Sequence, residues 1–152
     1  METTTNKTLL TVEATVNAPV EKAWEFYTQP SHITNWNFAS PDWHSPSAEN
    51  DLRVGGKFNF RMEAKDGSFG FDFWGHYDEV KENEVLEYTM GDGRKAVVSF
   101  VPENGNTRVV TTFEAEQTHS IEMQQGGWQA ILDNYKAYVE SESQGKSKAV
   151  SQ

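Results

Sequence analysis

Apolar and polar residues alternate through most of this chain, and the spacing becomes helical near the C-terminus. The first alternating segment runs from Leu10 to Val16, which predicts a half-buried strand. The same period of two recurs at residues 58–64, 69–78, 85–90, 95–101 and 107–115. Gly-containing turns separate these segments, including Asp66-Gly67 and Asp92-Gly93, which are typical of hairpins. The pattern therefore predicts an antiparallel meander.

The segment from Ser120 to Glu142 has the spacing of one long amphipathic helix, with Ser120 as its N-cap. Its apolar stripe consists of Trp128, Ile131, Leu132, Tyr135, Tyr138 and Val139. Gly126 and Gly127 interrupt it one turn before Trp128, at about 1 kcal/mol each relative to Ala. The pair indicates either close approach of a strand or a slight kink, or else room for a ligand under the helix.

Two short helices are expected after the first strand. Asn17-Ala18-Pro19 opens one helix, whose inner face carries Trp24, and Pro30 ends it. Residues 31–36 form the second helix. Residues 37–50 are irregular and rich in aromatic residues and Pro, and such rings favour a packed loop over a solvated one. Residues 52–54 follow as a short strand, and Gly55-Gly56 predicts a bend.

These elements predict an α+β fold in which a curved antiparallel sheet of about six or seven strands wraps around the long C-terminal helix. We expect a single domain over residues 8–142, with flexible tails at 1–7 and 143–152.

Composition narrows the functional classes. The 152 residues include no cysteine, which excludes thiol catalysis, disulfides and thiolate metal sites. The net charge of −10 argues against nucleic acid or an anionic membrane as a partner. The N-terminus has no signal-peptide pattern and no segment is apolar enough to span a bilayer, so a cytoplasmic location is expected.

Few motifs carry catalytic chemistry. The four histidines lack metal-ligand spacing, and no phosphate-binding loop or nucleophile elbow is present, so no metal and no cofactor is expected. His44 is the best acid/base candidate because Trp43 and two prolines surround it, although its ring could equally bond the loop backbone. Arg61 and Glu63 are interpreted as an outer-face pair.

The aromatic residues form the stronger signal. Aromatic side chains on the inner face of the sheet, on the helix and in the 36–44 loop would surround one concavity, which is either a filled core or a small-molecule site. The predicted ligand-binding residues are Trp36, Phe38, Trp43, His44, Phe60, Phe71, Phe73, Tyr88, Gln125 and Trp128.

Four stretches carry a resemblance that runs from about Leu10 to Ser141. They are Asn17–Trp24 (NAPVEKAW), Asp51–Phe58 (DLRVGGKF), Phe69–Tyr77 and Gly126–Asn134 (GGWQAILDN). The chain resembles the START-like (SRPBCC) helix-grip superfamily, and within it the single-domain bacterial homologues of the activator of the 90-kDa heat-shock-protein ATPase. Relatives often carry Cys where this chain has Ser45, so a thiol-dependent role is not expected.

The resemblance implies three possible functions. The superfamily binds lipids, steroids, flavonoid-like and polyketide molecules under the helix, which favours binding of a small hydrophobic molecule. A chaperone-associated interaction module is the first alternative, although co-chaperone relatives have an additional N-terminal domain that is absent from this sequence. A weak acid/base enzyme acting on a polyketide-like substrate is the second, and the resemblance supplies no catalytic residue for it.

Overall fold

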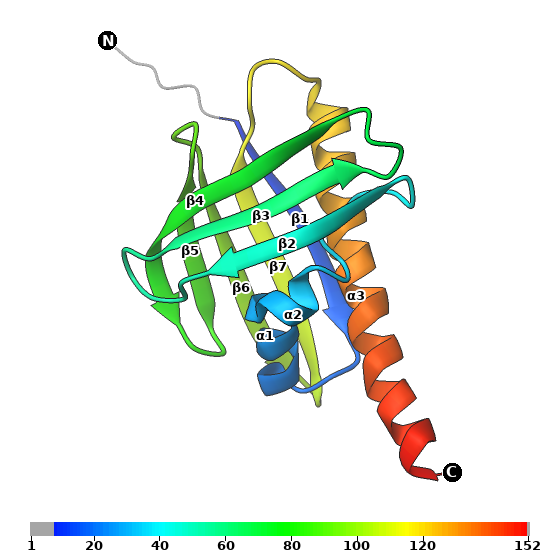
Figure 1. Ribbon diagram of the computed structural model, residues 1–152. Helices are drawn as coiled ribbons and strands as arrows, with labels where there is room; N and C mark the ends of the chain where they lie inside the picture. The colour runs from blue at the N-terminus through cyan, green and yellow to red at the C-terminus, as the bar shows by residue number, and fades with distance from the viewer. Residues whose placement is uncertain (1–7, 152) are drawn as a thin grey trace.

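A computed structural model of the chain describes residues 8–151, and the side chains of residues 8–142. Seven strands and three helices follow one another in the order predicted for a helix-grip domain (Figure 1). They are β1 (Leu9–Val16), α1 (Val20–Thr28), α2 (Pro30–Ile33), β2 (Trp43–Asn50), β3 (Lys57–Ala64), β4 (Gly70–Lys81), β5 (Val85–Met90), β6 (Lys95–Glu103), β7 (Asn106–Glu114) and α3 (Ile121–Ser151).

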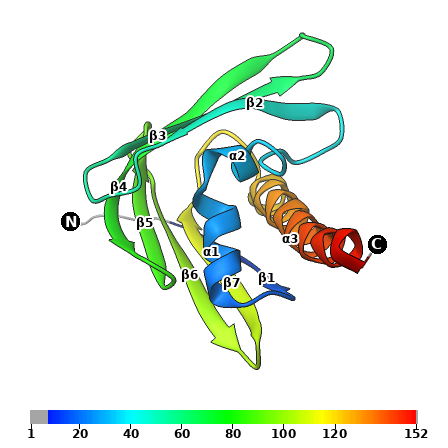
Figure 2. The same ribbon diagram turned by 60° about the horizontal axis from the view of Figure 1, so that its bottom comes forward.

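The strands form one antiparallel sheet in the order β1-β7-β6-β5-β4-β3-β2. The sheet curls strongly, and α1 and α3 lie in its concave side (Figure 2). This arrangement confirms the predicted α+β fold class, in which the sheet grips the C-terminal helix.

The curl is built into the strands. Irregular pairing interrupts β2 between His44 and Ser47, and β4 between Tyr77 and Glu79, and such bulges bend a strand. In β4, a Cβ on Gly75 would lie 2.4 Å from the carbonyl oxygen of Thr89 and 2.9 Å from the Phe58 ring. Only glycine therefore allows these neighbours to approach β4 so closely.

The two edge strands are protected in different ways. Helix α3 lies along β1, and Gln125 and Gln129 donate their side-chain amides to the carbonyl oxygens of Thr11 and Glu13 at 3.0 Å each. At the other edge, β2 contains Pro46, which cannot donate a backbone hydrogen bond. Both features hinder the pairing of these edge strands with a strand of another chain.

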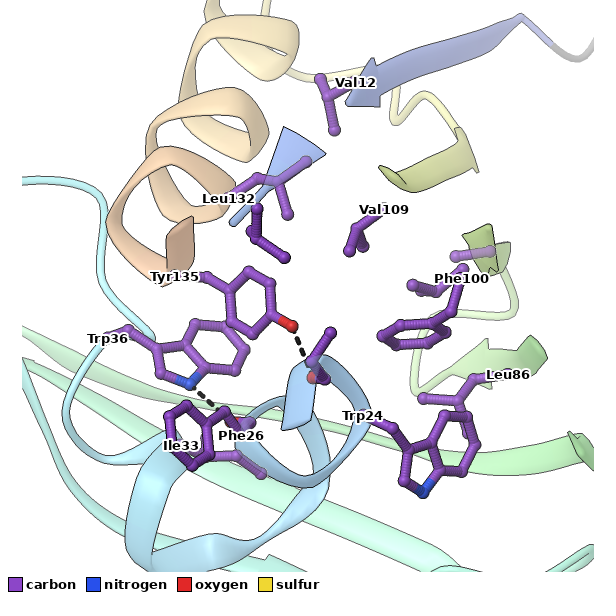
Figure 3. Packing of buried hydrophobic residues seen from close by; sticks show 14 of the residues in the cluster. Val12, Trp24, Phe26, Ile33, Trp36, Leu86, Phe100, Val109, Leu132 and Tyr135 are labelled. Atoms are coloured by element: carbon purple, nitrogen blue, oxygen red, sulfur yellow. Dashed lines mark hydrogen bonds between the residues drawn. The ribbon is translucent and has the colours of Figure 1, made fainter. Parts of the chain in front are cut away.

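The hydrophobic core lies between α1, α3 and the β5–β7 part of the sheet. Tyr135 of α3 is fully buried, and its hydroxyl donates to the carbonyl oxygen of Ala23 in α1. The indole of Trp36 donates to the carbonyl oxygen of Phe26 at 2.9 Å, and both bonds are drawn in Figure 3. These two bonds tie α3 and the segment after α2 to α1 within an apolar environment.

Three sequence-based boundaries need correction. Residues 43–50 were expected to be irregular but form β2, because an edge strand tolerates Pro46. Residues 52–54 were expected to form a strand but belong to a turn, in which the backbone N–H of Arg53 donates to Asp51 and that of Gly56 donates to Arg53. The second helix covers Pro30–Ile33 rather than residues 31–36, because proline is favoured at the first helical position.

The predicted ends of the domain differ from the observed helix in one respect. Helix α3 continues to Ser151, although the apolar stripe that predicted it ends near Glu142. The predicted tail at residues 1–7 lies outside the described residues, and for 143–151 only the backbone is described. In the described part of the chain, no helix is long and apolar enough to cross a membrane. The cytoplasmic location stays a prediction.

Candidate ligand cavity

A cavity of about 260 Å³ lies between the concave face of the sheet and α3. Side chains from β1, β3, β4, β5 and β7 form one wall, and α1, the segment after α2, and α3 form the other. The strands contribute to it because every second residue of each points toward the helix. The sheet and the helix therefore do not fill the space that they enclose.

The structure brings together six of the ten residues predicted to bind a ligand. The cavity is lined by Trp36, Phe60, Phe71, Phe73, Tyr88 and Trp128. A seventh, Trp43, lines a neighbouring groove. Phe60, Phe71, Phe73 and Tyr88 lie on the sheet side of the cavity, and Trp36 and Trp128 lie on the helix side.

Phe38, His44 and Gln125 line neither hollow. His44 pairs in register with Glu63 on the outer face of β3, and its Nε2 lies 3.8 Å from a Glu63 carboxylate oxygen. Gln125 bonds the edge of β1 instead. Because general acid/base catalysis requires contact with the substrate, His44 is not placed to act on a molecule in this cavity.

The neighbouring groove is more open and has a volume of about 350 Å³. Four side chains, Met62, Phe71, Trp128 and Ile131, line both hollows. These shared side chains separate the groove from the cavity, so the groove lies at the mouth of the cavity. Met123 on the groove and Phe69 beside Trp43 are both more than half exposed, which makes this rim apolar.

One residue of the glycine pair in α3 borders this groove, and the other, Gly126, is exposed. A Cβ added at Gly126 or Gly127 would meet nothing within 4 Å, which excludes close approach of another segment as the reason for either glycine. Gly127 lines the groove. Close approach of a strand is therefore excluded, and room for a ligand under the helix stays a prediction.

Ring geometry keeps the walls of the cavity apart. Trp128 stacks on Phe113 of β7 with 3.8 Å between ring centroids and 6° between planes, so it lies flat against the sheet. Its edge meets Phe73 at 6.2 Å and 87°. Phe58 stacks on Phe60 at 5.1 Å along the opposite wall. Each of these rings packs against a neighbouring ring, and none of them fills the centre of the cavity.

Eight of the lining side chains have polar nitrogen or oxygen atoms, and most of these side chains already have a hydrogen-bond partner within the protein. The hydroxyl of Tyr77 donates to Asn50 at 2.6 Å. Burial raises the pKa of Tyr27 to about 12, against the opposite effect of a hydrogen bond with Thr111. Burial also raises the pKa of Tyr88 well above its ordinary value. These phenols stay neutral at physiological pH.

Among the described residues that line the cavity, Arg94 is the one that carries a charge. Its Nε donates to a carboxylate oxygen of Asp92 at 2.8 Å, and its Nη1 donates to the carbonyl oxygen of Glu114 at 3.0 Å. The guanidinium therefore has partners within the protein. In the described part of the chain, no group of three His, Asp or Glu side chains is placed to hold a metal ion.

The lining residues that sequence reasoning missed include Asn37, Arg94 and Ile131. Ile131 lies one turn after Trp128 on the apolar stripe of α3, so its spacing could have identified it. Asn37 lies in the segment that was interpreted as irregular, where no periodicity indicates which side chains are buried. It is 7% exposed, and its amide nitrogen has no hydrogen-bond partner.

Comparison with known proteins places the chain in a family. Residues 17–140 match the family described as Activator of Hsp90 ATPase homolog 1-like protein. No curated protein matches the chain.

Solved structures of similar proteins share the fold. An AHSA1-like protein from Aeromonas hydrophila is 44% identical over 90% of this chain and 94% of its own, with a TM-score of 0.85. A protein from Cytophaga hutchinsonii is 50% identical over 88% of this chain and 93% of its own, with a TM-score of 0.75. A protein from Nitrosomonas europaea is 22% identical over 88% of this chain and 95% of its own, with a TM-score of 0.77, which shows the fold alone.

Proposed function

Because the chain belongs to the family of Activator of Hsp90 ATPase homolog 1-like proteins, we propose that its cavity binds a small hydrophobic molecule, aromatic or lipid-like. The observation that carries the proposal is the empty volume of about 260 Å³ among aromatic side chains. Protein interiors are normally packed as densely as organic crystals, so an unfilled space of this size requires a reason. A bound molecule is that reason.

The size of the cavity sets the size of the ligand. An engineered apolar cavity of about 150 Å³ holds one benzene molecule. A volume of about 260 Å³ is therefore suited to a molecule of about two rings, or an aliphatic chain of similar bulk. Such a ligand would bury about 250 Å² of apolar surface, worth about 6 kcal/mol, which corresponds to a Kd on the order of tens of micromolar.

Entry is proposed to occur through the groove at the mouth of the cavity. Phe71, Trp128 and Ile131 line both hollows, so movement of these side chains would join them. Exposed apolar residues at the rim, including Met123, would contact the ligand before it enters.

A titration with N-phenyl-1-naphthylamine tests the proposal, because this neutral probe fluoresces strongly only in apolar surroundings. Its two-ring naphthalene group matches the size of the cavity, and its phenyl ring would extend into the adjoining groove. Replacing Ile131 with Trp adds bulk at the boundary of the cavity and the groove and is expected to weaken probe binding at least about tenfold. Ile121→Trp is the matched control, since Ile121 is 39% exposed on the same helix and lines neither hollow. Absence of binding to the wild type, or equal binding by both variants, contradicts the proposal.

Interaction with a heat-shock chaperone is a second candidate, and the family match is the observation that favours it. The net charge of −10 suits a basic patch on a partner. The test is the ATPase rate of a bacterial 90-kDa heat-shock protein across a titration with this protein. A rate that does not change, together with no complex in pull-down, counts against it.

A further inference from the structure

Two buried side-chain atoms in the described part of the chain have no hydrogen-bond partner. They are Nδ2 of Asn37 and Oδ1 of Asn59. Asn59 is paired in register with Trp74 and Glu49 and lies on the outer face of β3, away from the cavity. Asn37 lines the cavity and is 93% buried, being 7% exposed.

An unpaired donor at this position is unusual. Folded proteins pair nearly all of their buried donors, because a donor that has left water without finding an acceptor is destabilising. An asparagine amide has two N–H groups to satisfy. Since the described residues supply no acceptor for this nitrogen, a molecule held in the cavity that Asn37 lines is the candidate acceptor.

The surrounding backbone holds Asn37 in place. Its own N–H donates to Ile33 at 3.0 Å, and the next N–H, of Phe38, donates to Trp36 at 2.8 Å. The carbonyl oxygen of Phe38 accepts a bond from the side chain of Asn134 in α3 at 2.9 Å. Bonds on both sides therefore fix the backbone of the segment that follows α2, and they leave the Asn37 side-chain amide able to rotate toward the cavity that this residue lines.

We propose that Asn37 is the polar anchor of the cavity and that the ligand is a neutral, mainly apolar molecule with one hydrogen-bond acceptor, such as a ketone or amide carbonyl oxygen. The inference rests on the proposed binding function and specifies its ligand class.

The rest of the lining explains why the ligand is neutral. Arg94 is already bonded to Asp92 and to the backbone of Glu114, so a ligand carboxylate would have to compete with these partners. Tyr27 and Tyr77 have partners in Thr111 and Asn50. A charged group would lose its hydration in this lining without finding an unpaired opposite charge, whereas a carbonyl oxygen needs only the donor that Asn37 offers.

A matched pair of probes tests the anchor. Tetralin and α-tetralone have the same two-ring skeleton and differ by one carbonyl group. Their Kd values are measured by calorimetry for the wild type, for Asn37→Leu and for Asn35→Leu. Asn35→Leu is the control, because Asn35 lies two residues away and has an exposed side chain that does not line the cavity.

The expected result is a change in the ratio of the two Kd values. Loss of one hydrogen bond to a buried donor should reduce the preference for α-tetralone by about 5- to 30-fold in Asn37→Leu, and leave it unchanged in Asn35→Leu. In wild-type protein labelled with ¹⁵N, the side-chain amide signal of Asn37 should shift with α-tetralone and not with tetralin. This measurement remains available if Asn37→Leu does not fold.

The outcomes separate the two proposals. If both probes bind and Asn37→Leu leaves the ratio of their Kd values unchanged, the proposal that Asn37 anchors the ligand is wrong. The proposal that the cavity binds a hydrophobic molecule is then retained. An Asn37 amide signal that responds equally to both probes has the same meaning. If neither these probes nor N-phenyl-1-naphthylamine binds to the wild type, the binding function is overturned and the anchor with it.

Discussion

Replacing Asn37 with Leu should stabilise the ligand-free protein. Leu has nearly the same branched shape as Asn but carries no polar atoms, so the substitution removes an unpaired buried donor without opening a cavity. Most substitutions of buried residues are destabilising, which makes the opposite sign a demanding test of the reasoning.

The desolvation penalty of one unsatisfied donor sets the magnitude. The free energy of unfolding should rise by about 1–3 kcal/mol, and the Tm by about 2–4 °C for each kcal/mol in a domain of this size. Asn134→Leu is the matched control, because that amide donates to the carbonyl oxygen of Phe38 at 2.9 Å. Its loss should lower the free energy of unfolding by about 0.5–1.5 kcal/mol.

Urea unfolding followed by Trp fluorescence measures both variants. The midpoint should move in opposite directions for the two substitutions while the slope m stays constant, since the surface exposed on unfolding hardly changes. If Asn37→Leu is destabilised as Asn134→Leu is, the Asn37 amide is bonded in the ligand-free protein. The reasoning that leads from an unpaired donor to an anchor then fails.

Three further predictions test other parts of the structure. Gly126→Ala and Gly127→Ala should each raise the free energy of unfolding by about 0.5–1 kcal/mol in thermal or urea unfolding, because both sites have open space, and only Gly127→Ala should narrow the groove and slow probe entry. Raising the pH should destabilise the fold between about pH 10 and 12, because Tyr27 ionises at its ordinary pKa of 10.0 when unfolded and only at about 12 when folded. The loss is about 3 kcal/mol for this residue, and urea titrations of Tyr27→Phe should show a smaller decline. His44→Ala should leave the Kd of N-phenyl-1-naphthylamine within about twofold, because His44 lies on the outer face.

The regular elements could be predicted because each pattern has one physical interpretation. Alternation over residues 95–101 and 107–115 can bury one face only as a strand, and the stripe from Trp128 to Val139 can do so only as a helix. The prediction failed over residues 43–50, where β2 is a sheet edge with a bulge at Pro46. An edge strand buries little and forms ladder bonds on one side, so its sequence has no strong periodicity to detect.

The cavity was only partly predictable. Alternation assigns Phe60 and Phe73 to the inner face, but the distance across that face depends on how far the sheet bends at Gly75 and at the bulges. Whether facing rings meet or leave a space is decided by that bend. Asn37 lies beyond such reasoning altogether, because no residue pattern identifies a polar side chain that will be buried without a partner.

If the proposed binding function holds, the stability of the ligand-free domain and the affinity for a ligand are opposed at the same positions. Glycine at 126 and 127 weakens α3 where it borders open space, and Asn37 leaves a donor unpaired within the core. Trp128 is held flat on Phe113 instead of reaching across the hollow. The two glycines and the unpaired donor make the ligand-free protein less stable than Ala and Leu at these positions would, as expected if the proposed ligand site limits stability. Substitutions that stabilise the empty domain at Asn37 should therefore weaken binding of a carbonyl ligand, a pairing of opposite effects that a residue with a purely structural role does not produce.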